Sequence, residues 1–141
     1  MITSRATRSQ PSAQSTCDIA VSFSTRVAGI RAVFDGAAET LQLTDYQDAC
    51  PIAAIALEVA STNERLRGAT ANVFESWIGS GTRRFIAAGF SETRGRELAI
   101  ALICALEGAF VLSRASRNTA ALGIAGRMLA DSVARELATA G

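Results

Sequence analysis

Apolar residues recur at every third or fourth position through most of the chain, and this period limits the fold more than any other feature. Such spacing places apolar side chains on one face of an α-helix. The first stripe contains Val27, Ile30, Phe34, Ala37 and Leu41. Similar stripes follow in 64–88, 93–116 and 119–138, and residues 52–60 are apolar nearly all round, as in a buried helix. The sequence therefore predicts an all-α fold, a five-helix bundle with short connections.

Residues suited to helix ends separate these segments. Pro51 fits the first turn of a helix, where its missing N–H has no intrahelical partner. Ser61 is followed three residues later by Glu64, which matches a capping box and predicts a long helix after it. The other candidates for helix ends are Gly89, Ser91 or Thr93, and Asn118. Gly79 and Gly81 mark either a kink or a close approach of another backbone.

The first 21 residues differ from the rest of the chain. They are rich in Ser, Thr and Gln, and no acidic residue precedes Asp18. We therefore divide the chain into a polar N-terminal tail, residues 1–21, and a helical domain, residues 22–141. The tail contains no apolar core of a secretory signal, and no apolar run approaches the roughly 18 residues of a membrane span. We expect a cytoplasmic protein that has no membrane contact.

Histidine is absent, which excludes several kinds of chemistry. A Ser–His–Asp triad, a Cys–His pair and an imidazole metal site all need it. The three cysteines, Cys17, Cys50 and Cys104, are widely spaced and predict neither a disulfide framework nor a CxxC metal site. Apolar neighbours predict that Cys104 is a small buried residue. Since no glycine-rich phosphate loop is present either, we expect a protein that is not an enzyme and uses no cofactor or metal.

Two acidic residues, Glu58 and Glu107, interrupt otherwise apolar helices. A buried carboxylate is costly unless it is paired. One interpretation is a polar anchor for a ligand in an apolar cavity. The other is a structural ion pair, for which Arg65, Arg114 and Arg117 are the candidate partners.

Four aromatic residues lie on the inward faces of the expected helices. They line a cavity for a lipophilic ligand or simply fill the core, and the sequence leaves both open. The four are Phe34, Phe74, Trp77 and Phe110.

Four short strings carry a resemblance to a known family. They are ACPIAAIALEVA at 49–60, FESW at 74–77, ALEGA at 105–109 and LSRA at 112–115. Over residues 26–138 the chain resembles the C-terminal domain of the TetR family of transcriptional regulators. Within that family it is similar to the branch that responds to multidrug-like and flavonoid-like compounds. That branch typically has Gly-Cys-Pro before the apolar helix, so Ala49 is a small departure.

The resemblance implies a ligand-sensing domain that forms a homodimer and binds a small lipophilic effector. In the family, the last two helices of each subunit form a four-helix dimer interface. Carried onto this sequence, the interface contains Ala105, Gly108, Leu112, Leu122, Gly126, Leu129 and Val133. The walls of the family's cavity correspond to Ile55, Val59, Phe74, Trp77, Ile78, Ile103, Glu107 and Phe110. Because the family's linking helix has no counterpart here, we expect a pocket that is open to solvent or plugged by Ile2 or Ile19.

The helix-turn-helix that begins a TetR-family repressor also has no counterpart in the polar residues that precede the match. The 14 basic residues are balanced by 13 acidic ones, without a basic patch. We therefore expect no direct DNA binding by this chain alone. It is a fragment, a shortened gene product or a stand-alone relative of the ligand-binding domain. The alternative function is a pure interaction module that heterodimerises with a full-length regulator and senses no ligand.

Overall fold

The computed structural model describes residues 13–47, 50–59 and 61–139, with side chains from Val27 onward. This part of the chain contains five helices and confirms the predicted all-α class. The helices are α1 (Ala13–Leu43), α2 (Pro51–Val59), α3 (Glu64–Ala87), α4 (Glu92–Ser116) and α5 (Ala120–Thr139).

The first helix begins earlier than the sequence pattern predicts. α1 starts at Ala13 and contains Ile19, whereas the helical pattern of the sequence starts at about Ser22. No proline or glycine lies between Ser12 and Ala28, so nothing in this stretch prevents a helix even though it lacks an apolar stripe. Ile2 and the side chain of Ile19, the suggested plugs of the pocket, lie outside the described residues.

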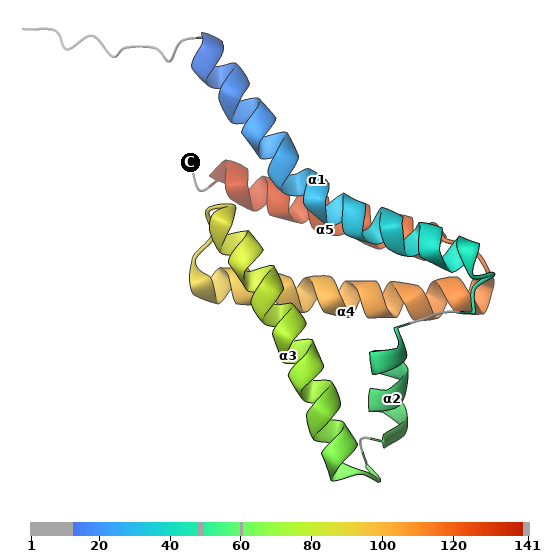
Figure 1. The fold of residues 1–141 in the computed structure, drawn as a ribbon. Coiled ribbons are helices and arrows are strands. Elements are labelled where there is room, and N and C mark those ends of the chain that lie inside the picture. Colours follow the sequence, from blue (N-terminus) through green and yellow to red (C-terminus); the bar gives the residue numbers. More distant parts are fainter. Residues whose placement is uncertain (1–12, 48–49, 60, 140–141) are drawn as a thin grey trace, which may run out of the picture.

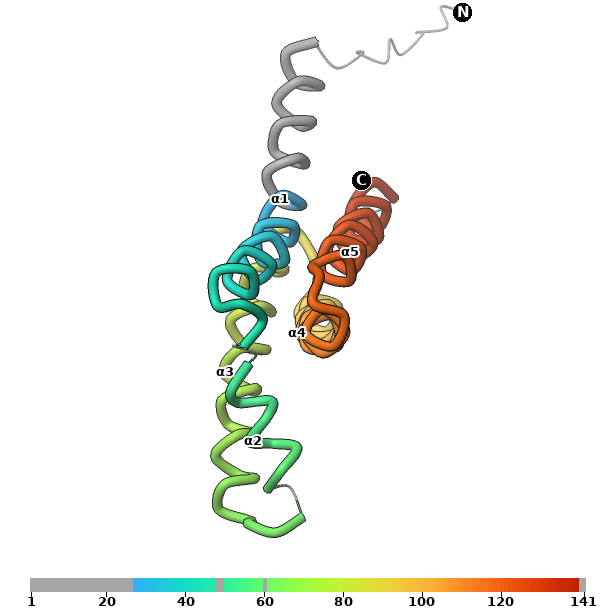
Figure 2. The backbone as a smooth tube through the Cα atoms, turned by 90° about the vertical axis from the view of Figure 1, so that its right-hand side faces the viewer, coloured from blue at the N-terminus to red at the C-terminus, as the bar shows by residue number. Residues whose placement is uncertain are grey.

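The five helices form two layers. Figure 2 shows α1, α3 and α2 in one layer, and α4 and α5 in the other. α1 packs along α5, α3 crosses α4, and α4 and α5 lie side by side as an antiparallel pair (Figure 1). α2 packs mainly against α3, at the end of the molecule farthest from α5.

Most of the fully buried side chains lie between α1 and α5. Phe34 and Leu41 of α1 are buried there with Leu122, Ala130 and Val133 of α5. Phe34 is therefore a core residue: only 1% of its surface is exposed. This interface is the main apolar core of the chain.

Two glycines allow close contacts between helices. A Cβ atom on Gly126 would lie 2.8 Å from Cβ of Phe34, and one on Gly81 would lie 2.9 Å from Cβ of Ala99. Real side chains do not approach so closely, so any larger residue would force α5 away from α1 or α3 away from α4. The close approach predicted as one possibility for Gly81 is confirmed.

The helix ends follow the sequence signals with one exception. The N-cap of α3 is Asn63, whose side-chain oxygen accepts a hydrogen bond from Leu66 N at 3.1 Å. The capping box based on Ser61 is wrong, because Glu64 is itself the first helical residue and pairs with Arg67. Elsewhere Ser91 Oγ accepts from Arg94 N, Asn118 Oδ1 accepts from Ala120 N, and Gly89 follows α3 with φ +108°.

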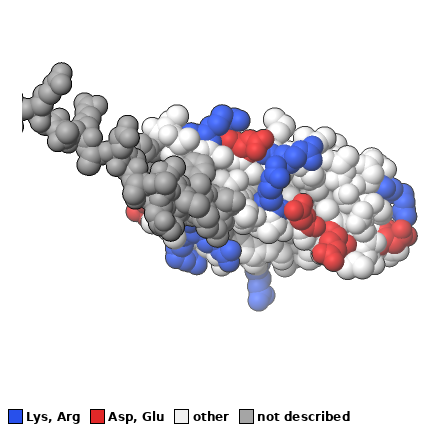
Figure 3. Space-filling view, turned by 90° about the horizontal axis from the view of Figure 1, so that it is seen from above, with Lys and Arg blue, Asp and Glu red and all other residues white. Residues whose placement is uncertain are grey.

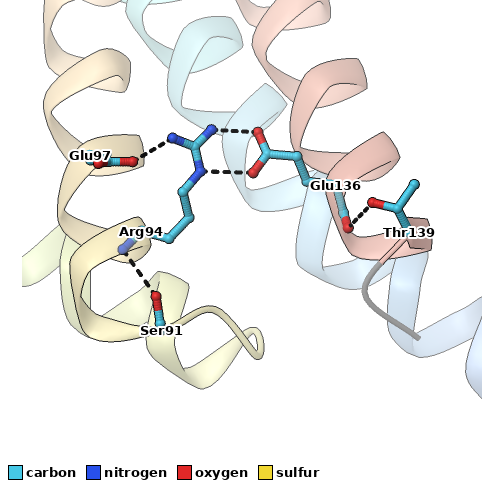
Figure 4. A network of polar contacts seen from close by, with 5 residues as sticks. All are labelled: Ser91, Arg94, Glu97, Glu136 and Thr139. Atoms are coloured by element: carbon cyan, nitrogen blue, oxygen red, sulfur yellow. Dashed lines mark hydrogen bonds and ion pairs between the residues drawn. The ribbon is translucent and has the colours of Figure 1, made fainter.

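Arginine side chains tie α4 to its neighbours. The Arg94 guanidinium donates to both carboxylate oxygens of Glu136 on α5, at 2.8 and 2.6 Å, and to Glu97 on α4 (Figure 4). Arg96 makes a similar two-point contact with Glu75 on α3, at 2.6 and 2.9 Å. Paired hydrogen bonds of this kind fix orientation as well as adding attraction.

The opposite end of α4 holds the loop that leads to α2. Arg117 Nη2 donates to Asp45 Oδ1 at 2.6 Å, and its guanidinium lies 5.5 Å from the centre of the Tyr46 ring. Arg114 Nε donates to the Tyr46 carbonyl oxygen at 3.2 Å. Asp45 and Tyr46 both have positive φ angles, 50° and 61°, which L-residues adopt at some cost. These contacts join Asp45 and Tyr46 to the C-terminal end of α4.

α4 is also the helix, among those described, that is long and apolar enough to cross a membrane by length and composition. Glu107 interrupts the apolar run of this helix. One such helix is weak evidence, because the core helix of a bundle passes the same test, and α4 here packs against α3 and α5.

Candidate functional site

An apolar pocket of about 490 Å³ opens between α2, α3 and α4. Its walls are Ala53, Ala56 and Leu57 from α2, Phe74 and Ile78 from α3, and the face of α4 from Ile100 to Val111. Among the residues that the structure describes, the pocket is open to solvent. A volume of this size is typical of sites for small organic ligands.

The sequence of α2 explains why space remains there. α2 is apolar at nearly every position, yet none of its described residues is buried. Ala53 and Ala56 are small, and Gly108 stands opposite them on α4. Large side chains at these positions would fill the gap, whereas small ones leave it open.

Glu107 is the charged residue in the wall of this pocket. It also lines a smaller adjoining pocket of about 180 Å³, which shares Ala53, Leu57 and Val111 with the first. Burial raises the pKa of the Cys50 thiol in the smaller pocket, and the nearby Glu107 carboxylate raises it further. Glu107 therefore borders both pockets, and its carboxylate interacts with the Cys50 thiol, which stays protonated.

The ion pairs shown within 27–47, 50–59 and 61–139 do not include Glu107 or Glu58. Arg117 pairs with Asp45 instead, and Arg114 donates to the carbonyl oxygen of Tyr46. Glu58 is exposed, so it bears no cost of burial that a partner would need to offset. These positions give no support to the structural ion pair, and Glu107 lines the pocket.

The structure brings half of the predicted ligand-binding residues together in one pocket. Those in the larger pocket are Phe74, Ile78, Ile103 and Glu107, and Phe110 lines the smaller one. Ile55, Val59 and Trp77 lie outside both linings. Trp77 is 40% exposed and packs edge-on against Phe74, with ring centroids 5.4 Å apart. Their role in binding remains a prediction.

Sequence reasoning missed several residues of the pocket. On α4 these are Ile100, Cys104 and Val111, which follow the spacing of three and four residues from Ile103 and Glu107. That spacing could have found them. The expectation that Cys104 is buried is wrong: Cys104 is exposed, because this face of α4 borders the open pocket and not the core.

The residues predicted for the dimer interface divide into two groups. Leu122, Gly126 and Val133 are buried inside the chain, where they face α1, so they are not available to a second subunit. The remaining four are exposed or half-buried: Ala105, Gly108, Leu112 and Leu129. The structure adds two large exposed apolar residues on α5 that were not predicted, Ile124 and Met128.

Comparisons with known proteins agree with this architecture. The model of the family described as the C-terminal domain of LmrA/YxaF-like transcriptional regulators matches residues 27–128. Two proteins of Mycobacterium tuberculosis, the uncharacterized HTH-type transcriptional regulators MT0206 (strain CDC 1551 / Oshkosh) and Rv0196 (strain H37Rv), are each 35% identical over 111 residues. The match covers 75% of this chain but only 57% of each relative. The chain thus matches the C-terminal domain of such regulators in sequence, and it belongs to the TetR family of transcriptional regulators.

Proposed function

We propose that this domain senses a small lipophilic effector, which binds in the pocket between α2, α3 and α4. The observation that carries the proposal is the pocket itself, which combines about 490 Å³ of open apolar space with a single carboxylate in its wall. Apolar walls with few polar groups suit a lipophilic molecule, because burying its surface supplies affinity and the polar group supplies orientation.

The position of α2 suggests how binding is transmitted. α2 packs on α3 and faces α4 across the pocket, so an effector there contacts all three helices. α4 is in turn joined to α5 through Arg94 and Glu136. A ligand that binds one arrangement of α2 and α4 more tightly than another shifts the domain toward it.

We further propose that the chain forms a homodimer through the outer face of the α4–α5 layer. No other described helix covers this face (Figure 2). It carries exposed large apolar residues, of which Leu112 is 62% and Met128 is 68% exposed. Exposed apolar patches of this kind usually mark an interface.

We do not expect this chain by itself to bind a specific DNA sequence. Basic and acidic side chains are interspersed over the face of the molecule that Figure 3 shows, without a basic patch. Affinity for DNA depends largely on clustered cations that displace counterions from phosphates.

The alternative is an interaction module that pairs with a full-length regulator and binds no effector. The exposed apolar residues of α4 and α5 favour it as much as they favour a homodimer. The pocket distinguishes the two functions, since pairing alone does not require it.

The proposal is tested with a variant in which a large side chain occupies the pocket. We expect the neutral fluorescent probe N-phenyl-1-naphthylamine to bind the wild-type chain. Ala56→Trp places a large side chain in the pocket and should weaken binding at least about tenfold. Ala71→Trp, on the exposed surface of α3, is the matched control and should leave affinity unchanged. Fluorescence titration measures both, and circular dichroism verifies the fold. Failure of the wild-type chain to bind, or equal binding by Ala56→Trp, would contradict effector sensing.

A further inference from the structure

We propose that the effector of this pocket is an amphipathic amine: an apolar body that carries one cationic group, bound by the carboxylate of Glu107. This inference rests on the proposed effector pocket and adds the sign of the ligand's charge.

The first observation is the charge of the pocket wall. Glu107 is the one ionisable carboxylate among lining residues that are otherwise apolar, apart from the Cys104 thiol. Fewer water molecules screen a charge beside apolar walls than one at an open surface, so its attraction for a cation is stronger there. A ligand without a cationic group would displace water from the carboxylate without replacing the hydrogen bonds that the water makes.

The second observation is that the two arginines at the C-terminal end of α4 have other partners. The described part of the chain shows no ion pair to Glu107. Arg114 shares the smaller pocket but donates its Nε–H to the Tyr46 carbonyl, and Arg117 pairs with Asp45. The Cys50 thiol beside Glu107 has a raised pKa and adds no charge of its own. Among the residues that line the larger pocket, Glu107 is therefore the one charged residue, and a cationic ligand would neutralise it.

The third observation is where the carboxylate lies. Glu107 borders both pockets, so an ammonium group bound to it occupies their junction. From that point the apolar body of the ligand extends into the larger pocket, toward Phe74, Ile78 and Ile103. One ligand would then pair its cationic group with Glu107 and bury its apolar body in the larger pocket.

An anionic ligand is the opposing possibility, with Arg114 as its partner. Arg114 is exposed and lines only the smaller pocket, two helical turns or about 10 Å along α4 from Glu107. An anion in the larger pocket would face the like charge of Glu107 without contact with Arg114. The geometry therefore favours the amine.

The experiment compares two ligands of equal shape and opposite charge, 4-phenylbutylamine and 4-phenylbutanoate, by calorimetric titration of the full chain at neutral pH. We expect the amine to bind at least about tenfold more tightly. Glu107→Gln keeps the size of the side chain and should abolish this preference. Glu58→Gln removes an exposed carboxylate of α2 that lines neither pocket, and it should leave the preference intact.

A second measurement on the wild-type chain does not depend on a variant. Added salt should reduce the affinity for the amine more than that for neutral N-phenyl-1-naphthylamine, because salt screens only the charged contact. Equal affinity for amine and carboxylate, tighter binding of the carboxylate, or a preference that survives Glu107→Gln would overturn the inference. If the neutral probe binds while the amine shows no preference, only the charge assignment fails. If neither binds, the effector pocket fails as well.

Discussion

The two ends of the molecule use apolar residues in opposite ways. Between α1 and α5, Phe34, Leu122 and Val133 are almost completely buried. α2 is apolar at nearly every position, but none of its described residues is buried, and Leu57 is 82% exposed. Apolar side chains are thus buried inside the chain at one end of the molecule and exposed at the other.

This contrast shows that the buried core and the open pocket lie in different parts of the molecule. Burial between α1 and α5 removes apolar surface from water and stabilises the fold. The exposed surface of α2 and the facing side of α4 can gain the same free energy only when something else covers them. A bound effector would provide that cover.

The largest expected effect tests this separation directly. Phe34→Ala should lower the free energy of unfolding by about 3–5 kcal/mol, because it removes a fully buried ring and leaves a cavity. Leu57→Ala at the other end should change it by no more than about 0.5 kcal/mol. Urea unfolding followed by circular dichroism measures both. Similar losses for the two variants would show that α2 belongs to the core.

An intermediate effect is expected at the contact between α5 and α1. Gly126→Ala should destabilise the chain by about 1–3 kcal/mol, because the added methyl group would overlap Phe34. Gly36→Ala on α1 is the matched control, since no atom lies within 4 Å of its added Cβ. It should stabilise the chain by about 0.5–1 kcal/mol through better helix propensity. Stabilisation by Gly126→Ala would show that the two helices lie farther apart.

The smallest effect on the subunit fold is expected on the outer face of α5. Met128→Glu replaces a side chain that is 68% exposed, so the helical content of the chain should not change. In a dimer formed through this face the new charge would lose its hydration, and the subunits should separate. Light scattering at micromolar concentration measures the change in mass. A wild-type chain that is already monomeric, or a variant that stays dimeric, would contradict the proposed interface.

Local sequence patterns were sufficient for the helices and most of their ends. The stripe of Val27, Ile30 and Phe34 and the caps Ser91 and Asn118 act over a few residues, so they can be read without knowledge of the tertiary structure. Ser61 was misjudged because several residues there can cap a helix, and only the backbone decides among them. The structure assigns that position to Asn63.

The pocket was predicted only in part, for a related reason. Phe74, Ile78, Ile103 and Glu107 were identified through resemblance, whereas the small residues Ala53 and Ala56 carry no signal that they border empty space. A gap between helices depends on the volumes that both partners present. Spacing within one helix does not contain that information.

The apolar period along the chain was enough to show that this protein is built of helices and which residues share a face of each helix. Only the tertiary structure decided what covers each face. Leu122 and Val133 form one stripe with Gly126 in the sequence, and an interface between subunits was as consistent with that stripe as a core. Packing against Phe34 of α1 placed the stripe inside the chain. The physical reason is that a helix specifies its own apolar side, while the partner that buries it is chosen by contacts between residues far apart in the sequence.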